Sequence, residues 1–282
     1  MRSGRGLWIV TSSWFVKESF EDVVLINASD SDVKNISAAD GEPWIKKSIS
    51  EVLEFQKNTI INHLVVSKSA EKITFDISFI NSLNIASLFI FNSNFLGITS
   101  QLTFQNVKKI IIDNVPGVLD LTGFSRGIDL YLVKWHKKFS VKEADRISVL
   151  TARSFNPSEN KTLGHISAFV NVTSLDLQLT SIESLDGIEN LKKLKEFRLS
   201  YARKLLDVSA LSNLPILYLV AFESCKKVKS FASIAKSRSI KYIVIVKSSP
   251  IDSLSVFEDM GLDTLAVFQT KIIDGDKTLL TN

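Results

Sequence analysis

The chain has 282 residues, of which 45% are hydrophobic and 23% charged, with a formal net charge of +4 at neutral pH. This composition argues against a disordered chain, and the mild charge gives a weak preference for an acidic partner rather than the footprint of a nucleic-acid-binding domain. Cys225 is the single cysteine, so no intrachain disulfide can form, which suits a reducing compartment.

The N-terminal segment does not match an export signal. Its apolar run, Leu7–Val10, stops at a Thr-Ser-Ser triplet and is too short for the hydrophobic part of a signal peptide. No later apolar run reaches the roughly 20 residues of a membrane-spanning helix. We therefore expect a cytoplasmic protein without a membrane partner.

Residues 1–60 are predicted to form an N-terminal cap made of strands and one helix. Strands are expected over residues 7–16 and 20–27, on either side of a turn at Lys17–Ser19. An amphipathic helix is expected from Pro43 onwards, and its apolar face needs a surface to cover. The residues expected to face the first repeat are Trp44, Ile49 and Leu53.

A repeating phrase begins after residue 60 and is clearest in Val172–Leu199. Its apolar residues follow the pattern L-x-x-L-x-L, which ends as a short strand, and then recur every three residues, as in a 3₁₀ turn. The phrases start at Ile61, Ile85, Val107, Gly127, Ala144, Val172, Leu194, Leu214, Ile240 and Leu262. The starts lie 24, 22, 20, 17, 28, 22, 20, 26 and 22 residues apart, so the period is close to 22. The spacing of 17 followed by 28 indicates either an irregular repeat or a misplaced register near residue 145. A weaker match inside the cap is Phe20, Val23 and Leu25.

This phrase and period resemble the leucine-rich repeat proteins, most closely the short 22-residue type of bacterial internalins. The resemblance implies a right-handed α/β solenoid of about ten repeats over residues 61–282, a horseshoe with a parallel sheet on its concave side. The asparagine that usually follows each strand is missing from the best repeats. We therefore expect serine or threonine hydroxyls and water to satisfy some of the backbone groups there. The residues at that position are Thr180, Ala202 and Phe222.

Strand alternation predicts which residues face outward from this sheet. The central outward column is predicted to contain Val65, Phe89, Ile111, Tyr131, Ser148, Asp176, Arg198, Tyr218, Val244 and Ala266. The next column is predicted to contain Ser67, Phe91, Asp113, Val133, Leu150, Gln178, Ser200, Val220, Val246 and Phe268.

These columns describe a largely apolar, aromatic face, which favours an interaction site. The alternative is that the cap covers some of the rings, or that the register is misplaced. Tyrosine and arginine are frequent interface anchors. The predicted partner-binding residues are Phe89, Tyr131, Arg198, Tyr201, Tyr218, Tyr242 and Phe268.

The sequence offers little for catalysis, and we expect no enzyme, no cofactor and no metal site. The three histidines, His63, His136 and His165, are far apart and have no second ligand at metal spacing. Cys225 is expected to be a small buried hydrophobe. Lysine clusters at residues 137–138, 192–195 and 226–229 are interpreted as solvated faces rather than a phosphate-binding stripe.

The expected function is therefore recognition of another protein, by a chain that is monomeric when free. A bacterial immunity protein that neutralises a cognate toxin is one candidate, and an adaptor or regulatory subunit is the alternative. A nucleic-acid-binding accessory protein acting through lysines is a third, less favoured hypothesis.

The segment Ser154–Gly164 is predicted to be a protruding loop.

Overall fold

The computed structural model describes residues 6–11, 14–19, 23–27, 63–67, 87–91, 106–114, 116–157 and 161–281. Before residue 106 it describes only the course of the strands and the burial of Ser87 and Leu88. The chain divides into two compact units. The first comprises Met1–Ser125 and Lys138–Lys142, and the second comprises Arg126–Lys137 and Glu143–Asn282.

The first unit contains three groups of paired strands. An antiparallel hairpin is formed by β1 (Gly6–Thr11) and β2 (Trp14–Ser19). A parallel group follows in chain order: β3 (Val23–Asn27), β4 (His63–Ser67), β5 (Ser87–Phe91) and β6 (Lys109–Asp113). The third group pairs β7 (Gly117–Asp120) with β9 (Phe139–Lys142) in parallel.

The N-terminal strands differ in detail from the prediction. The expected turn at residues 17–19 lies inside β2, and the chain reverses instead between Thr11 and Trp14. In the register of β3 with β4, Val24 and Ile26 align with the predicted core residues Leu64 and Val66, so the predicted frame is displaced by one residue. The expected helix, with Trp44, Ile49 and Leu53, lies outside the described residues. The boundary of the cap at residue 60 therefore stays a prediction.

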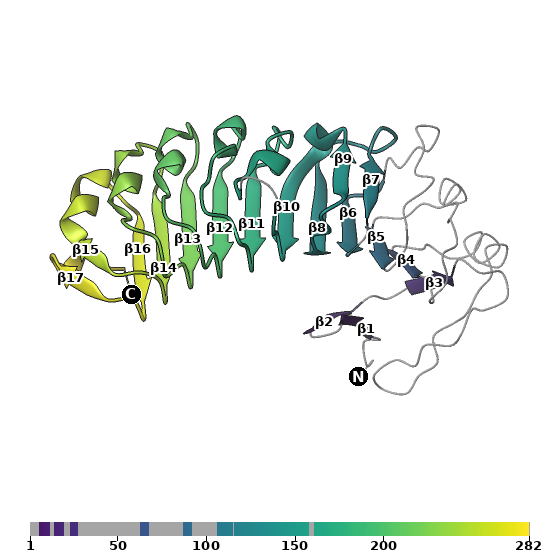
Figure 1. Ribbon diagram of the computed structural model, residues 1–282, viewed down its shortest axis with the longest axis horizontal. Coiled ribbons are helices and arrows are strands. Elements are labelled where there is room, and N and C mark those ends of the chain that lie inside the picture. The colour runs from purple at the N-terminus through teal and green to yellow at the C-terminus, as the bar shows by residue number, and fades with distance from the viewer. Residues whose placement is uncertain are drawn as a thin grey trace. The chain divides into compact units, whose positions relative to one another are not determined.

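The second unit is a solenoid built on one parallel sheet (Figure 1). Its strands are β8 (Ile128–Lys134), β10 (Ile147–Arg153), β11 (Ser174–Gln178), β12 (Glu196–Ser200), β13 (Leu219–Glu223), β14 (Tyr242–Val246) and β16 (Thr264–Phe268). Each strand pairs with the next in this order. At the far end, β15 (Ile251–Ser253) pairs with β17 (Ile272–Asp274).

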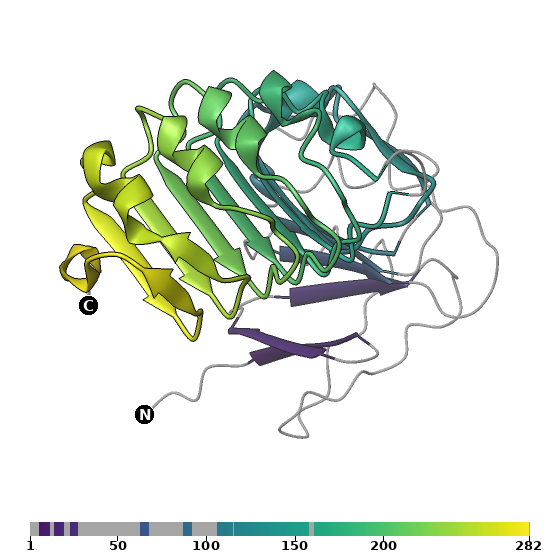
Figure 2. The ribbon, with the colours of Figure 1, turned by 60° about the vertical axis from the view of Figure 1, so that its left-hand side comes forward.

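Short 3₁₀ helices return the chain along one side of this sheet (Figures 1 and 2). They are η2 (Ala144–Arg146), η3 (Gly164–Ile166), η4 (Ile188–Asn190), η5 (Ser209–Asn213), η6 (Ala232–Lys236), η7 (Leu254–Met260) and η8 (Lys277–Leu279). Apolar residues three apart suit this helix type, because its side chains at positions i and i+3 lie above one another. Among the described residues, no helix has the length and apolar character needed to cross a membrane.

The core of the solenoid lies between the sheet and these helices. The second and fourth residues of β11, Leu175 and Leu177, have no exposed surface, and Leu191 on the return side is equally buried. Aromatic rings fill the space between neighbouring repeats: Phe197 meets Phe222 edge to face, with ring centroids 6.3 Å apart. Each repeat therefore buries its apolar edge against its neighbours, as in other solenoids.

Each strand of the main sheet from β10 to β16 ends in a turn with one left-handed residue. Except after β16, the last strand of the sheet, the backbone N–H of this residue donates to the carbonyl that ends the next strand, as from Tyr201 to Glu223 and from Lys247 to Phe268, at N···O distances of 2.8 and 3.0 Å. These bonds offset the cost of the left-handed conformation, which is about 1–2 kcal/mol for a residue with a side chain. The residues concerned are Ser154, Leu179, Tyr201, Ser224, Lys247 and Gln269, with φ between 49° and 56°.

Hydroxyl groups replace the missing asparagines in some of these turns, as predicted. Thr180 Oγ1 donates to the carbonyl of Phe155 at 2.5 Å. Ser248 Oγ accepts from the backbone N–H of Cys225 at 3.1 Å, and the N–H of Ser248 itself donates to Thr270 Oγ1 at 3.1 Å. The prediction is wrong for Phe222: this residue is a core residue of β13, and Cys225 occupies the turn position.

Two strands are displaced by three residues from their predicted frames. In β10 the buried residues are Ile147, Leu150 and Ala152, rather than Ala144, Ile147 and Val149. In β13 they are Leu217, Val220 and Phe222, rather than Leu214, Leu217 and Leu219. The paired central residues Thr151, Asp176, Arg198, Ala221, Val244 and Ala266 are then separated by 25, 22, 23, 23 and 22 residues, a more regular period.

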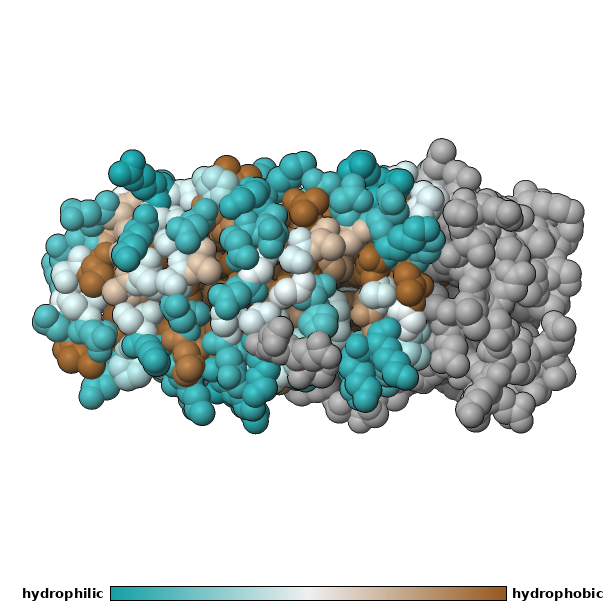
Figure 3. Space-filling view, turned by 45° about the horizontal axis from the view of Figure 1, so that its top comes forward, coloured by the Kyte–Doolittle hydropathy of each residue, from teal (hydrophilic) through white to brown (hydrophobic). Residues whose placement is uncertain are grey.

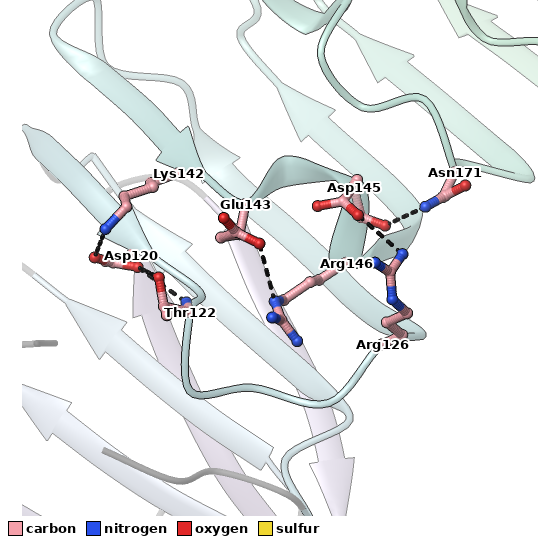
Figure 4. Close-up of polar contacts among 8 residues, drawn as sticks. All are labelled: Asp120, Thr122, Arg126, Lys142, Glu143, Asp145, Arg146 and Asn171. Atoms are coloured by element: carbon pink, nitrogen blue, oxygen red, sulfur yellow. Dashed lines mark hydrogen bonds and ion pairs between the residues drawn. The ribbon is translucent and has the colours of Figure 1, made fainter. Parts of the chain in front are cut away.

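The irregular repeat near residue 145 has its own polar contacts (Figure 4). Within the second unit, Arg126 pairs with Asp145 at 2.9 Å, and Asn171 Nδ2 donates to the carbonyl of Asp145 at 2.6 Å. Within the first unit, Lys142 Nζ donates to Asp120 at 2.8 Å. A change of register between β10 and β8, at Ile147–Val149, leaves one extra residue in β10.

Candidate functional site

The sheet of the second unit has an outer face, formed by the first, third and fifth residues of each five-residue strand and opposite to the core. Thr151, Asp176 and Arg198 are neighbours in its central column. The predicted Ser148 and Tyr218 are not in this column, because β10 and β13 are displaced, and Ala221 takes the place of Tyr218. Leu150 and Val220, also predicted to face outward, are fully buried.

The outer face is therefore less apolar than the sequence predicted. Polar side chains dominate β11 and β12, and apolar ones gather on β14 and β16. On the face of the molecule seen in Figure 3, hydrophobic patches are likewise separate and surrounded by hydrophilic residues. The exposed apolar residues of the outer face include Phe268, with 52% of its surface accessible.

Four residues of the outer face are joined in what we call the Arg198 cluster: Glu196, Arg198, Tyr218 and Tyr242. Arg198 Nη1 donates to Glu196 Oε2 at 2.6 Å, and the Tyr218 hydroxyl donates to Glu196 Oε1 at 2.8 Å. The Tyr218 ring meets the Tyr242 ring edge to face, with centroids 5.8 Å apart. Both of Glu196's carboxylate oxygens are thus engaged, and the cluster extends from β12 to β14.

The charges of the cluster support one another. The hydrogen bond from Arg198, followed by that from Tyr218, lowers the pKa of the Glu196 carboxyl below its ordinary value. The same hydrogen bond to Glu196 raises the pKa of Tyr218, so the hydroxyl keeps its proton. The Arg198 side chain remains 41% exposed, and its other N–H groups make no hydrogen bond within the described residues. The bond to Glu196 therefore fixes the Arg198 guanidinium, and its remaining N–H groups can donate to a partner.

Asp176 lies beside Arg198 on the outer face but does not form its ion pair. Its Oδ2 accepts from Gln178 Nε2 at 3.0 Å, and its Oδ1 is buried without a hydrogen-bond partner in the described structure. Burial raises the pKa of this carboxyl above its ordinary value, although Gln178 and the charge of Arg198 oppose the shift. The sequence analysis placed Asp176 in the outward column but did not select it, because its burial could not be inferred from the pattern.

The structure joins only some of the predicted partner-binding residues. Arg198, Tyr218 and Tyr242 belong to one cluster, although Tyr218 precedes β13 rather than lying at its centre. Tyr201, 40% exposed, is the left-handed residue after β12.

Of the remaining three, two are on other strands of the second unit and one belongs to the first unit. Tyr131 is on β8, separated from β12 by β10 and β11. Phe268 is on β16, at the end of the sheet. Phe89 is on β5 of the first unit, and its side chain lies outside the described structure.

Cys225 is the single thiol of the chain. Cys225 is fully buried, as predicted, and burial raises the pKa of its thiol to about 11, so it is not a thiolate at neutral pH. Within the part of the chain that the structure describes, no three His, Cys, Asp or Glu residues are grouped as metal ligands would be. In the predicted loop 154–164, Phe155 and Leu163 are buried, so its two ends are packed, and residues 158–160 lie outside the description.

The consecutive parallel strands, the 3₁₀ returns and the buried L-x-L residues define the class: the chain has the fold of the leucine-rich repeat proteins. No protein-family model matches the sequence, and no curated protein matches it either. Similar solved structures include an internalin from Listeria monocytogenes, with 15% identity, coverage of 79% of this chain and 74% of that chain, and a TM-score of 0.44. They also include a leucine-rich repeat protein of Leptospira interrogans, with 10% identity, coverage of 78% and 86%, and a TM-score of 0.22.

Proposed function

We propose that this chain is a non-catalytic recognition protein that binds another protein on the outer face of β11–β14. The observation that carries the proposal is the Arg198 cluster, in which an arginine and two tyrosines are fixed by one glutamate on a rigid sheet. Arginine and tyrosine are over-represented among the residues that dominate binding energy at interfaces. Fixing them before binding lowers the entropy that the complex must overcome.

The surroundings of the cluster resemble the layout of a standard interface. Adjacent strands lie about 4.8 Å apart, so β11 to β14 span about 15 Å. Apolar residues on β14 and β16, among them Val244 and Phe268, border the polar cluster on one side. An interface core with this mixture of aromatic, aliphatic and hydrogen-bonding groups suits a folded protein partner.

A finer proposal concerns the partner. A bacterial toxin that this chain neutralises would meet the unused donors of Arg198 with an acidic group, in keeping with the net charge of +4. An adaptor or regulatory subunit would use the same face without abolishing its partner's activity. Co-expression of the identified partner separates the two: restored growth with the wild-type chain, lost with Arg198→Ala, supports the toxin proposal.

The primary experiment compares baits that differ only on the outer face. Proteins captured from the native host by the wild-type chain are identified, and their affinities are measured by calorimetry for Arg198→Ala, Tyr242→Ala and the control Lys193→Ala. Truncating an anchor is expected to cost about 2 kcal/mol or more, because Arg198 and Tyr242 would be desolvated at the centre of the interface. Lys193 is exposed and lies before β12, so its replacement should leave the affinity unchanged.

The binding measurements can also contradict the proposed binding site. If Arg198→Ala and Tyr242→Ala both bind the partner as tightly as the wild type, with unchanged thermal unfolding, the outer face is not the binding site. If Lys193→Ala lost as much affinity for the partner as the two outer-face variants, the loss would reflect a general effect of charge or of sample preparation rather than a contact on this face.

A further inference from the structure

Basic residues gather where the strands of the outer face end. We call the six exposed residues in the turns after β12, β13, β14 and β16 the basic rim: Arg203, Lys204, Lys226, Lys227, Lys247 and Lys271. From the sequence alone, the lysine clusters are interpreted as solvated faces. Strand pairing aligns Arg203 with Lys226 and Lys204 with Lys227, while Lys247 and Lys271 lie at other positions of the next two turns.

The superposition follows from the strand pairing. Each strand is paired residue by residue with the next, from Glu196 against Leu219 to Phe268 against Val246. Arg203 and Lys226 each follow a buried turn residue, Ala202 or Cys225, and so occupy equivalent positions. Adjacent strands are about 4.8 Å apart, so the turns after β12 to β16 place these positive charges along an edge roughly 15 Å long.

Acidic residues are absent from these turns. Segments 201–206, 224–229, 247–250 and 269–271 contain seven Lys or Arg residues and no Asp or Glu. None of the six rim residues forms an ion pair within the described structure. The Glu183 carboxylate, which senses the charges of two rim lysines, is bonded to Lys161 at 2.8 Å, and its pKa is lowered chiefly by that bond and further by the charges of Lys204 and Lys227.

Such a row is unfavourable in the free protein. The backbones of aligned rim residues such as Arg203 and Lys226 are about 4.8 Å apart, which is less than the screening length of about 8 Å at physiological salt, so repulsion between their charges is only partly screened. A partner that brings carboxylates to the rim removes the repulsion and gains attraction in the same step.

We propose that the basic rim binds an acidic segment of the protein partner, a run of Asp and Glu side chains lying along the turns after β12–β16. This inference rests on the proposed function, and it specifies the chemistry of one side of the partner. Tyr201, exposed within the row, and Phe268, exposed at its end, supply apolar contacts beside the charges.

Two observations favour an acidic polypeptide over nucleic acid. The rim borders an outer face that itself bears Asp176, Glu196 and Glu223, and these carboxylates repel a continuous phosphate backbone. A polypeptide can place acidic residues on the rim and neutral or basic ones on the face. The row is also short, whereas nucleic-acid-binding surfaces carry positive charge over a larger area.

The test uses two probes and two matched variants of the full chain. The probes are a fluorescein-labelled polyglutamate peptide and a duplex DNA with the same number of negative charges. The rim variant is Lys226→Glu with Lys227→Glu, and the control is Lys192→Glu with Lys193→Glu, an exposed pair before β12 at the opposite end of the strands. Both variants change the net charge equally, and thermal unfolding checks that both remain folded. Should the reversed charges disturb the rim, Lys226→Gln with Lys227→Gln provides the same comparison.

The wild-type chain is expected to bind polyglutamate with an affinity that falls steeply between about 50 and 200 mM salt. The rim variant should bind at least about tenfold more weakly and the control less than about threefold more weakly, because the interaction is local. Equal losses in the two variants, or rim-dependent binding of DNA tighter than that of polyglutamate, would overturn the proposal. Arg198→Ala tests the proposed function separately: if polyglutamate does not bind but Arg198→Ala still weakens binding of the captured partner, the rim proposal fails and the proposed function stands.

Discussion

Asp176 is the residue at which stability and binding are expected to conflict. One of its carboxylate oxygens is buried without a hydrogen-bond partner in the described structure, on the face proposed to bind. An unsatisfied buried acceptor costs about 1–3 kcal/mol, and an ionised one more. Proteins often give up stability at functional sites. We therefore expect the unpaired oxygen of Asp176 to accept a hydrogen bond from the partner.

Asp176→Asn is therefore expected to raise the free energy of unfolding at pH 7, by up to about 1 kcal/mol, while weakening partner binding. Burial places the folded-state pKa of Asp176 above its unfolded value, so the ionised carboxylate destabilises the fold at neutral pH. The penalty fades as the pH falls through the folded-state pKa, and the gain from Asn should shrink with it. Urea unfolding at pH 7 and near the ordinary Asp pKa of about 4 measures both quantities.

The matched control for this change is Asp186→Asn, at an exposed position where the change should stay within about 0.5 kcal/mol. A loss of stability in Asp176→Asn at pH 7 would mean that the carboxylate makes a stabilising contact. Unchanged partner affinity would remove Asp176 from the proposed interface.

At the scale of single repeats, the sequence predicted the elements better than their register. The strand positions of β11, β12, β14 and β16 follow directly from the L-x-x-L-x-L phrase. The 3₁₀ segments before β10 and β13 also carry apolar residues three apart. The L-x-x-L-x-L phrase therefore fits equally well when it is placed three residues earlier, as at Leu214 and Leu217. Only tertiary pairing separates the two frames, and the extra residue at Ile147–Val149 in β10 hid the regular period.

Contacts between repeats can be tested at Gly187, which immediately precedes η4 and has φ of 100°. A Cβ there would lie 2.9 Å from the carbonyl carbon of Leu163 and 3.0 Å from the nitrogen of Gly164, in the preceding repeat. Gly187→Ala should therefore destabilise the protein by about 2–4 kcal/mol, through both backbone strain and collision with neighbouring backbone. Denaturant unfolding measures the loss.

Gly127→Ala is the control that measures the cost of the positive φ without a collision between repeats. Gly127 has φ of 84°, and nothing lies within 4 Å of a Cβ built there, so only the backbone cost of about 1–2 kcal/mol is expected. Equal losses at the two glycines would mean that the repeats separate easily at Leu163–Gly164 and that this packing contributes little.

At the scale of the whole molecule, the repeat period in the sequence was enough to predict the solenoid fold. The candidate site could be described only from the three-dimensional structure. Repetition of one phrase identifies a solenoid because each copy must bury the same edge. Arg198 and Tyr242 could be selected because they lie in well-registered strands. Their connection through Glu196, the burial of Asp176 and the alignment of the basic rim depend on distances between strands. The predicted helix with Trp44 lies outside the described residues, so the cap remains untested.

The last prediction concerns how the second unit unfolds. Leu177 in β11 and Leu217 before β13 are both fully buried, so Leu→Ala at either should cost about 2–5 kcal/mol. The exposed control Lys193→Ala should change stability by less than about 0.5 kcal/mol. Because each repeat contacts only its neighbours, Leu177→Ala should speed hydrogen exchange in β10–β12 and Leu217→Ala in β12–β14, with β16 least affected. Uniform acceleration across β8 to β16 in both variants would show instead that the solenoid opens as a single cooperative block.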